Sequence, residues 1–226
     1  MLRAVIFDFN GILVDDEPIH LELFRKVLEE EGLALSDEDY YARYLGMDDR
    51  GCFRAVFKDR GKALQDAPLA KLIQRKAKYY RESIAERTVI FPGAKRLVSN
   101  LAEHLPLAVA SGALREEIEM ILRGAGLREY FQVIVSAEDV ADGKPHPEIF
   151  VKALRELNRG GPQSETILSS ECLVVEDSKE GILAAHRAGI KCLAVANSHP
   201  AGELAAEAVV ASLEEVTLPF LESLFK

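Results

Sequence analysis

The chain has no tryptophan, and aromatic residues make up only 7% of it. So few stacking side chains argue against a platform for single-stranded nucleic acid. Acidic residues outnumber basic ones by 37 to 28, and the resulting net charge of -9 disfavours binding to a nucleic-acid backbone. We therefore expect no nucleic-acid partner, although cations gathered at one place could still bind a small phosphate.

Long apolar runs are also missing. No segment approaches the ~20 residues that cross a bilayer, and the start, MLRAVIFDF, lacks the basic stretch and long apolar segment of a secretion signal. The three cysteines, Cys52, Cys172 and Cys192, are far apart and show no metal-type spacing. We expect buried, reduced thiols in a cytoplasmic protein that has no membrane partner.

Short apolar runs rich in β-branched residues are present instead. Each is too short for a helix and too continuous for a half-exposed strand, so each predicts a buried parallel strand. These runs are Ala4–Phe7, Leu107–Ala110, Val133–Val135, Leu173–Val175, Cys192–Ala196 and, near the C-terminus, Ala208–Ala211. Amphipathic stretches of helix length alternate with them, at Gly93–Glu103, Leu114–Ala125, Pro147–Leu157 and Lys179–Ala188. The alternation predicts an α/β fold with a doubly wound, Rossmann-like parallel sheet.

One connection interrupts this alternation. About a hundred residues separate the first two predicted strands, whereas a usual crossover needs only about a dozen. Most of this connection has helical periodicity, at Ile19–Glu31, Asp37–Leu45 and Leu69–Ile84. We predict a helical domain over residues 16–87, inserted into a core domain made of residues 1–15 and 88–226.

Polar residues follow four of the predicted strands at their carboxyl ends, where open parallel sheets bind ligands. An acid directly after a buried strand costs desolvation energy unless it is paired or metal-bound. Each residue alone could serve as a turn, a helix cap or a surface group, but four strands ending this way together indicate a site for a divalent cation and a phosphate. The residues are Asp8 and Asn10, then Ser111 and Gly112, then Lys144, and finally Glu176, Asp177 and Ser178.

In order and content, these segments resemble the four motifs of the haloacid dehalogenase-like hydrolases. The matching segments are Asp8-Phe9-Asn10-Gly11, Ser111-Gly112, Lys144-Pro145-His146-Pro147 and Glu176-Asp177-Ser178. The resemblance covers essentially the whole chain, and the helical insert lies where one class of the family has its cap. The stretch from Asp15 to His20 is most similar to the phosphatase and β-phosphoglucomutase-like subfamily.

The resemblance implies a magnesium-dependent phosphotransferase and a role for each motif residue. Asp8 would attack phosphorus and form an aspartyl-phosphate. Mg²⁺ would be held by Asp8, by Asp177 and by the main-chain carbonyl of Asn10, with help from Glu176. Phosphate oxygens would be bound by Ser111, by the amides near Gly112 and by Lys144, which would also neutralise charge on the phosphoryl group.

Asn10 departs from the family pattern, which usually has an aspartate two residues after the nucleophile. That aspartate protonates the leaving alcohol and later activates water, and an amide can do neither. Three explanations are open: an engineered near-isosteric substitution, which we favour; a natural residue in a weak enzyme or a regulator; or a different chemistry. The first predicts a phosphatase of reduced activity.

The insert offers candidate substrate-binding residues in Glu17, His20, Arg50 and Lys76, although a solvated helix face is an equally good interpretation for most of them. Arg50 is the most suggestive of the cations, because it follows Gly46–Asp49, which we interpret as a loop that ends a helix. The substrate is expected to be a small phosphorylated metabolite, with a sugar phosphate favoured, and the protein is expected to be a monomer.

Two other functions remain open. One is a phosphomutase of the β-phosphoglucomutase type, whose Ser-Lys-Asn stretch for a second phosphate is replaced here by Ala113-Leu114-Arg115. The other is a phosphometabolite-binding regulator that performs no catalysis.

Overall fold

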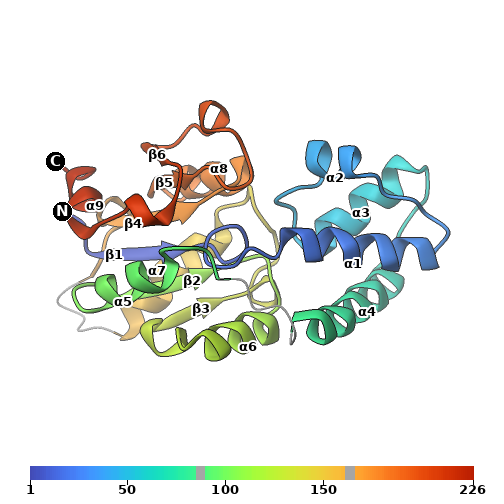
Figure 1. Cartoon of the computed structure of the whole chain (residues 1–226), viewed down its shortest axis with the longest axis horizontal. Coiled ribbons are helices and arrows are strands. Elements are labelled where there is room, and N and C mark those ends of the chain that lie inside the picture. The colour runs from blue at the N-terminus through green and yellow to red at the C-terminus, as the bar shows by residue number, and fades with distance from the viewer. Residues whose placement is uncertain (85–89, 161–165) are drawn as a thin grey trace.

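The computed structural model describes residues 1–84, 90–160 and 166–226, and its centre is a six-stranded parallel sheet (Figure 1). The strand order is β3-β2-β1-β4-β5-β6, so the chain builds the sheet outward in both directions from β1. This order confirms the predicted doubly wound α/β fold. The strands are β1 (Ala4–Phe7), β2 (Leu107–Ala110), β3 (Val133–Val135), β4 (Cys172–Glu176), β5 (Lys191–Val195) and β6 (Ala208–Val210).

Helices cover both faces of the sheet because alternate strand residues point to opposite sides and are apolar on both. Val5 and Phe7 of β1 belong to one core, and Ala4 and Ile6 belong to another. The first core includes residues of α5 (Ala94–Ala102), α6 (Arg115–Ala125) and α9 (Leu218–Ser223). The second includes residues of α7 (Glu148–Gly160) and α8 (Lys179–Arg187).

Short 3-10 turns join several of these elements. They are η1 (Arg128–Tyr130), η2 (Ala137–Asp139), η4 (Ser169–Glu171), η5 (Ala201–Glu203) and η6 (Leu213–Glu215).

The register of the central strands brings their carboxyl ends to one edge. Phe7, the last residue of β1, lies opposite Val109 of β2 and Val175 of β4. The amide of Asp8 continues the ladder and donates to the carbonyl of Val175 at 2.9 Å. The residues that follow these strands therefore emerge side by side.

The described residues between β1 and α5 form four helices with a hydrophobic core of their own. Figure 1 shows them at the end of the sheet toward which β1 points, while both termini lie at the opposite end. This position places the helices over the strand ends that carry the polar residues. The helices are α1 (Glu17–Glu30), α2 (Asp37–Arg43), α3 (Asp49–Asp59) and α4 (Asp66–Ile84).

The helix α3 was absent from the prediction, which treated Gly46–Asp49 as a loop that ends the preceding helix. That loop also starts the next helix, since Asp48 is the N-cap of α3 and its side chain accepts from the amide of Gly51 at 2.6 Å. Cys52, Phe53 and Val56 form its buried face.

The predicted limits of the insert stay a prediction. The return to the sheet domain at residues 87 and 88 lies outside the described residues. On the outgoing side, Ile19 and Leu23 of α1 pack into the same core as the sheet, and so does Tyr80 of α4. The insert and the sheet domain therefore share apolar contacts at the point where they meet.

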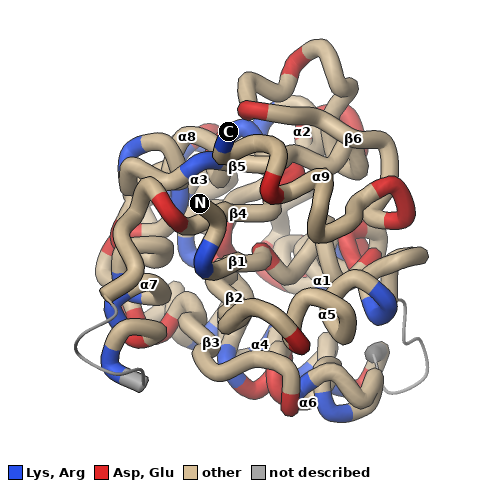
Figure 2. Tube along the Cα trace, turned by 90° about the vertical axis from the view of Figure 1, so that its left-hand side faces the viewer, with Lys and Arg blue, Asp and Glu red and all other residues tan. Residues whose placement is uncertain are grey.

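The prediction for the cysteines is confirmed. Cys52, Cys172 and Cys192 are all free and buried. None of the helices in the described part of the chain is long and apolar enough to cross a membrane. Lys and Arg residues are interspersed with Asp and Glu along the trace, as Figure 2 shows.

Candidate active site

The loop after β1 presents Asp8 at the sheet edge, where its side chain is 10% exposed. The loop turns back on itself, because the carbonyl of Phe9 accepts from the amides of both Leu13 and Val14. Gly11 makes this turn with φ of 77°, a left-handed conformation that favours glycine. After this tight turn, α1 begins at Glu17, eight residues beyond Phe9.

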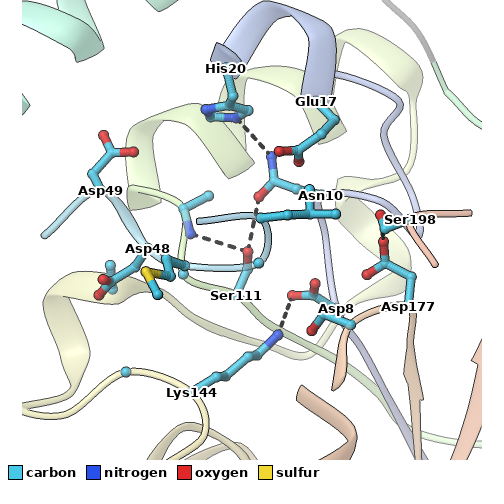
Figure 3. Close-up of a pocket in the computed structure, with 18 of the residues that line it drawn as sticks. Asp8, Asn10, Glu17, His20, Asp48, Asp49, Ser111, Lys144, Asp177 and Ser198 are labelled. Carbon is cyan, nitrogen blue, oxygen red and sulfur yellow. Dashed lines mark hydrogen bonds and ion pairs between the residues drawn. The ribbon is translucent and has the colours of Figure 1, made fainter. Parts of the chain in front are cut away.

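Lys144 reaches this carboxylate from the loop that precedes α7. Its Nζ lies 2.7 Å from Oδ1 of Asp8 (Figure 3). The same Nζ lies 2.5 Å from Oε1 of Glu176. Burial alone would lower the pKa of Lys144, but these two carboxylates outweigh burial and raise it. The lysine is therefore a fixed positive charge between two acids.

Glu176 is fully buried and has a partner for each oxygen. Its Oε1 accepts from Lys144, and its Oε2 accepts from the amides of Asp177 and Ser178, each at 2.7 Å. A Cβ at Gly181 would lie 1.7 Å from Oε1, so only glycine fits at that position of α8. Since both oxygens are occupied, Glu176 mainly positions Lys144 and the loop after β4.

Asp177 is the third buried acid, and it packs against the loop after β1. A Cβ on Gly11 would lie 2.0 Å from its Oδ2, so the turn and the carboxylate can be this close only with glycine there. Ser198, beyond β5, donates a hydrogen bond to the same oxygen. Burial, together with the neighbouring Glu176 and Asp8, raises the pKa of Asp177 well above its usual range.

The three acids Asp8, Glu176 and Asp177 form a cluster whose negative charge exceeds the positive charge of Lys144 beside it. Oxygens of Asp8, Glu176 and Asp177 lie within 4.8 Å of one another, with Lys144 as the cation that pairs with two of them. Burial raises the pKa of Asp8 to about 6 despite the lysine, and Glu176 adds to the effect. Crowded carboxylates and hard oxygen donors are what Mg²⁺ binds, so the residues present fit a magnesium ion.

Ser111 follows β2 and meets Asn10 over the pocket (Figure 3). Its Oγ donates to Oδ1 of Asn10 at 3.3 Å and accepts from the amide of Ala113 at 3.2 Å. Gly112 beside it lines the pocket, and a Cβ there would lie 3.1 Å from Asp48 of the insert. The structure thus brings the predicted phosphate-binding pair to the mouth of the carboxylate cluster.

The amide of Asn10 is held from the other side by Asp16, which is wholly buried. Nδ2 of Asn10 donates to the two carboxylate oxygens of Asp16, at 3.0 and 2.8 Å. The hydroxyl of Tyr80 and Nε2 of His20 also donate to Asp16. These donors outweigh burial, which acts in the opposite sense, and lower the pKa of Asp16.

His20 lines the pocket, and a buried lysine lies behind it. Nζ of Lys76 lies 2.7 Å from Nδ1 of His20 and 2.6 Å from Oδ1 of Asp49. Because an ammonium only donates, Nδ1 accepts, and the ring proton lies on Nε2, which faces Asp16. Lys76 is 1% exposed and does not line the pocket, so it acts on the site through His20 and Asp49.

The insert side of the pocket is lined by acids. Glu17, Asp48 and Asp49 come from the insert, and Glu117 comes from α6. Glu117 is 3% exposed, and its Oε1 has no hydrogen-bond partner among the described residues. Burial raises the pKa of Glu117 to about 7. Glu117 therefore gives this end of the pocket a buried acceptor with unused capacity.

The predicted residues of the core motifs lie together at the sheet edge. Of the predicted residues of the insert, some line the pocket and others do not. Glu17 and His20 line the pocket, but Arg50 does not. Arg50 lies on the exposed side of α3 and donates to the carbonyl of Ala141 at 3.3 Å. Arg50 was expected near the site because Gly46–Asp49 was interpreted as a loop that ends a helix, whereas Asp48 caps the start of α3.

Some site residues were missed by the sequence reasoning. Ser198 follows β5 and could have been found by the rule that found the others, since it too lies beyond a strand end. Asp16, Asp49 and Glu117 show no such signal, because their roles depend on how helices of the insert and of the core dock.

Comparison with known proteins gives the same assignment. The profile of the haloacid dehalogenase-like hydrolases matches residues 5–195. The chain is 30% identical over 193 residues to the phosphorylated carbohydrates phosphatase of Thermotoga maritima, covering 84% of this chain and 83% of that protein. It is 31% identical over 224 residues to the chloroplastic 5-amino-6-(5-phospho-D-ribitylamino)uracil phosphatase of Arabidopsis thaliana. That match covers 98% of this chain but spans only 57% of the relative.

A solved structure has the same architecture. CbbY from Rhodobacter sphaeroides, in complex with phosphate, superposes with a TM-score of 0.85 at 25% identity, covering 98% of this chain and 100% of that one. With the match of the family profile, the four motifs and the inserted helices, this likeness settles the assignment. The chain belongs to the haloacid dehalogenase-like hydrolase family.

Proposed function

We propose that the protein is a magnesium-dependent phosphomonoester hydrolase that acts on a small phosphorylated metabolite. The observation that carries this proposal is the cluster of Asp8, Glu176 and Asp177 around Lys144 at the sheet edge. A fixed lysine beside a carboxylate, with spare acidic ligands next to it, suits both binding of a phosphoryl group and attack on it. The phosphatases among the relatives support the same reaction class.

Asp8 is the proposed nucleophile. One of its oxygens attacks phosphorus, the bond between phosphorus and the substrate oxygen breaks, and an aspartyl-phosphate forms. Water then attacks phosphorus, the bond to Asp8 breaks, and phosphate leaves. Lys144, Ser111 and the amide of Gly112 are proposed to hold the phosphoryl oxygens through both steps.

Magnesium would be held by Asp8 and Asp177 and by the main-chain carbonyl of Asn10, with Glu176 in support. Bound there, it would offset phosphoryl charge that Lys144 alone does not balance. The negative charge of the cluster and the raised pKa of Asp8 support a requirement for such a cation.

Asn10 limits the proposed reaction. It lies where the family usually has its acid/base aspartate, and an amide neither protonates the leaving alcohol nor takes a proton from water. Loss of a general acid or base typically costs ~10²–10⁴ in rate. We therefore expect slow turnover of alkyl phosphates and faster turnover of esters whose leaving groups need no proton.

The substrate class follows from the acids at the insert side of the pocket. Glu17, Asp48 and Glu117 would accept hydrogen bonds from sugar hydroxyls and would repel a second phosphate. This supports a sugar monophosphate over a bisphosphate and makes a phosphomutase the less favoured alternative.

A cytoplasmic location is proposed on the reduced state of three buried cysteines.

The test is phosphate release from a panel of phosphomonoesters, with and without Mg²⁺, by the parent protein and its Asp8→Asn variant. The proposal expects metal-dependent release from sugar monophosphates by the parent alone. Binding of these compounds without any release, by a parent that also binds Mg²⁺, would indicate a regulator. Release confined to bisphosphates would indicate a mutase-like site.

A further inference from the structure

Asp16 sits at the N-cap position of α1, yet its side chain makes no capping hydrogen bond. A surface aspartate at a helix start usually accepts from the helix amides. Here the carboxylate turns inward, is 0% exposed, and accepts from the side chains of Asn10, His20 and Tyr80. Its location is therefore explained by these three side chains and not by the helix end.

The amide of Asn10 is used at both of its ends. Its nitrogen donates to Asp16 and also lies 3.1 Å from Nε2 of His20. Its Oδ1 accepts from Ser111 Oγ at 3.3 Å, and Figure 3 draws the contacts with His20 and Ser111. An aspartate at position 10 has the same shape and could still accept from Ser111, but it could not donate to Asp16. It would also place a second carboxylate about 3 Å from that of Asp16, where like charges repel strongly.

The same contacts join the two parts of the protein. Asn10 belongs to the loop that carries Asp8, whereas His20 lies on α1 and Tyr80 on α4. The rings of His20 and Tyr80 stack with centroids 4.9 Å apart, and both donate to Asp16. Asp16 is thus a shared acceptor at the junction of the nucleophile loop with the inserted helices.

We propose that Asn10 and Asp16 form a matched amide–carboxylate pair, in which Asp16 is the positioning residue for the nucleophile loop. In this proposal asparagine at position 10 is the residue that the buried Asp16 requires. Two consequences follow. The single change Asn10→Asp weakens the protein, and full gain of turnover from an aspartate at position 10 requires that position 16 changes with it.

The test is a double-mutant cycle of Asn10→Asp, Asp16→Asn and the two together. The double variant exchanges the groups and so keeps one amide facing one carboxylate. We expect Asn10→Asp to lower Tm by roughly 5–10 °C, because it removes a hydrogen bond to a charged group and adds repulsion. The exchange should restore Tm to within ~3 °C of the parent.

Phosphate release adds a readout that stability alone would not move. The exchanged variant should turn over at least ~10-fold faster than Asn10→Asp at equal KM, since its aspartate is held in place and can act as acid and base. This second expectation rests on the proposed hydrolase function. The Tm cycle needs no turnover, so complete inactivity of all four proteins would count against that function and leave the pair standing.

A matched control is Asn158→Asp, in α7. Asn158 also uses both ends of its amide, but its partners are the carbonyl and the amide of Ile167. Combined with Asp16→Asn, this change should lower Tm additively, without coupling. The proposal is overturned if Asn10→Asp is as stable as the parent, or as active as the exchanged variant. Should Asp16→Asn fail to fold, the comparison of Asn10→Asp with the exchange still decides.

Discussion

The two ends of the pocket handle negative charge differently. At the sheet edge, Asp8, Glu176 and Asp177 are fixed by Lys144, by main-chain amides and by glycines that leave no room for a side chain. At the insert side, Glu117 has an oxygen with no partner among the described residues, and Glu17 and Asp48 line the same space. The sheet edge is crowded and fixed by many contacts, whereas the insert side has a buried acceptor without a partner among the described residues.

This difference indicates a division of labour. Rigid positioning of charge is what phosphoryl transfer requires, and it is supplied by the strand ends. Acceptors that face the pocket are what recognition of hydroxyl groups requires, and most of the acids at the insert side come from the insert. The contrast predicts that changes at the sheet edge abolish chemistry or folding, whereas changes at the insert side redirect selectivity.

The largest effect is expected for Asp8→Asn, which removes the nucleophile and keeps the shape. Turnover should fall by at least ~10⁴-fold, while the circular dichroism spectrum stays that of the parent. Phosphate release under saturating substrate and Mg²⁺ measures the loss. Residual turnover within tenfold of the parent would show that the chemistry lies elsewhere.

Gly11→Ala tests the crowding at the sheet edge. Its Cβ would meet Oδ2 of Asp177 at 2.0 Å, in a backbone with φ of 77°. We expect a loss of about 3 kcal/mol or more in unfolding free energy, together with weaker Mg²⁺ binding.

Gly32→Ala is the matched control for that change. Gly32 has φ of 69°, but a Cβ there would have nothing within 4 Å. It should cost only the strain of the left-handed conformation, about 1–2 kcal/mol, and leave Mg²⁺ binding unchanged. Denaturant unfolding and metal titration compare the two, and equal losses would contradict the close packing inferred at Gly11.

Glu117→Gln tests selectivity at the insert side. At a pH well above 7, where Glu117 is ionised, removal of its buried negative charge should raise kcat/KM for substrates with a second anionic group about tenfold relative to sugar monophosphates. Glu116→Gln on the same helix is the control, because Glu116 has a side chain 70% exposed and pairs with Arg81. If both variants shift selectivity equally, net charge and not the pocket is responsible.

The smallest effect concerns pH. The folded protein raises the pKa of Glu117 from 4.5 to about 7, so it binds this proton more tightly than the unfolded chain does. Ionised Glu117 therefore destabilises the folded protein. This loss of unfolding free energy is absent below about pH 4.5, grows as pH rises, and is complete above about pH 7. Relative to Glu117→Gln, the parent should lose about 1–3 kcal/mol between these limits. Parallel curves of stability against pH would contradict this.

The sheet edge of the site was predictable because strand ends in a parallel sheet align by a simple rule. Asp8, Lys144 and Asp177 each follow a buried apolar run, and the register of β1 with β4 then brings two of them together. The doubly wound fold followed from the same runs. Ser198 obeys the rule as well, since it follows β5.

The insert side was not predictable in the same way. Helical periodicity identifies a buried face, but it does not say which other helix that face meets. Asp16 illustrates the limit, since an aspartate before a helix has an ordinary explanation as a cap and its inward turn depends on α4. Arg50 lies outside the pocket on α3, a helix that was not predicted, and Glu117 gains its role only from docking against the insert.

The measurement that tests the central claim most directly is mass spectrometry of the protein after a rapid acid quench of its reaction with acetyl phosphate and Mg²⁺. Acetate leaves without a proton, so Asn10 does not impede the first step, whereas the water attack that follows lacks its base. The account predicts that a phosphoryl group accumulates on the peptide with Asp8, only with Mg²⁺ present and not in Asp8→Asn. Absence of phosphoryl from Asp8, in protein shown to bind Mg²⁺, would contradict it.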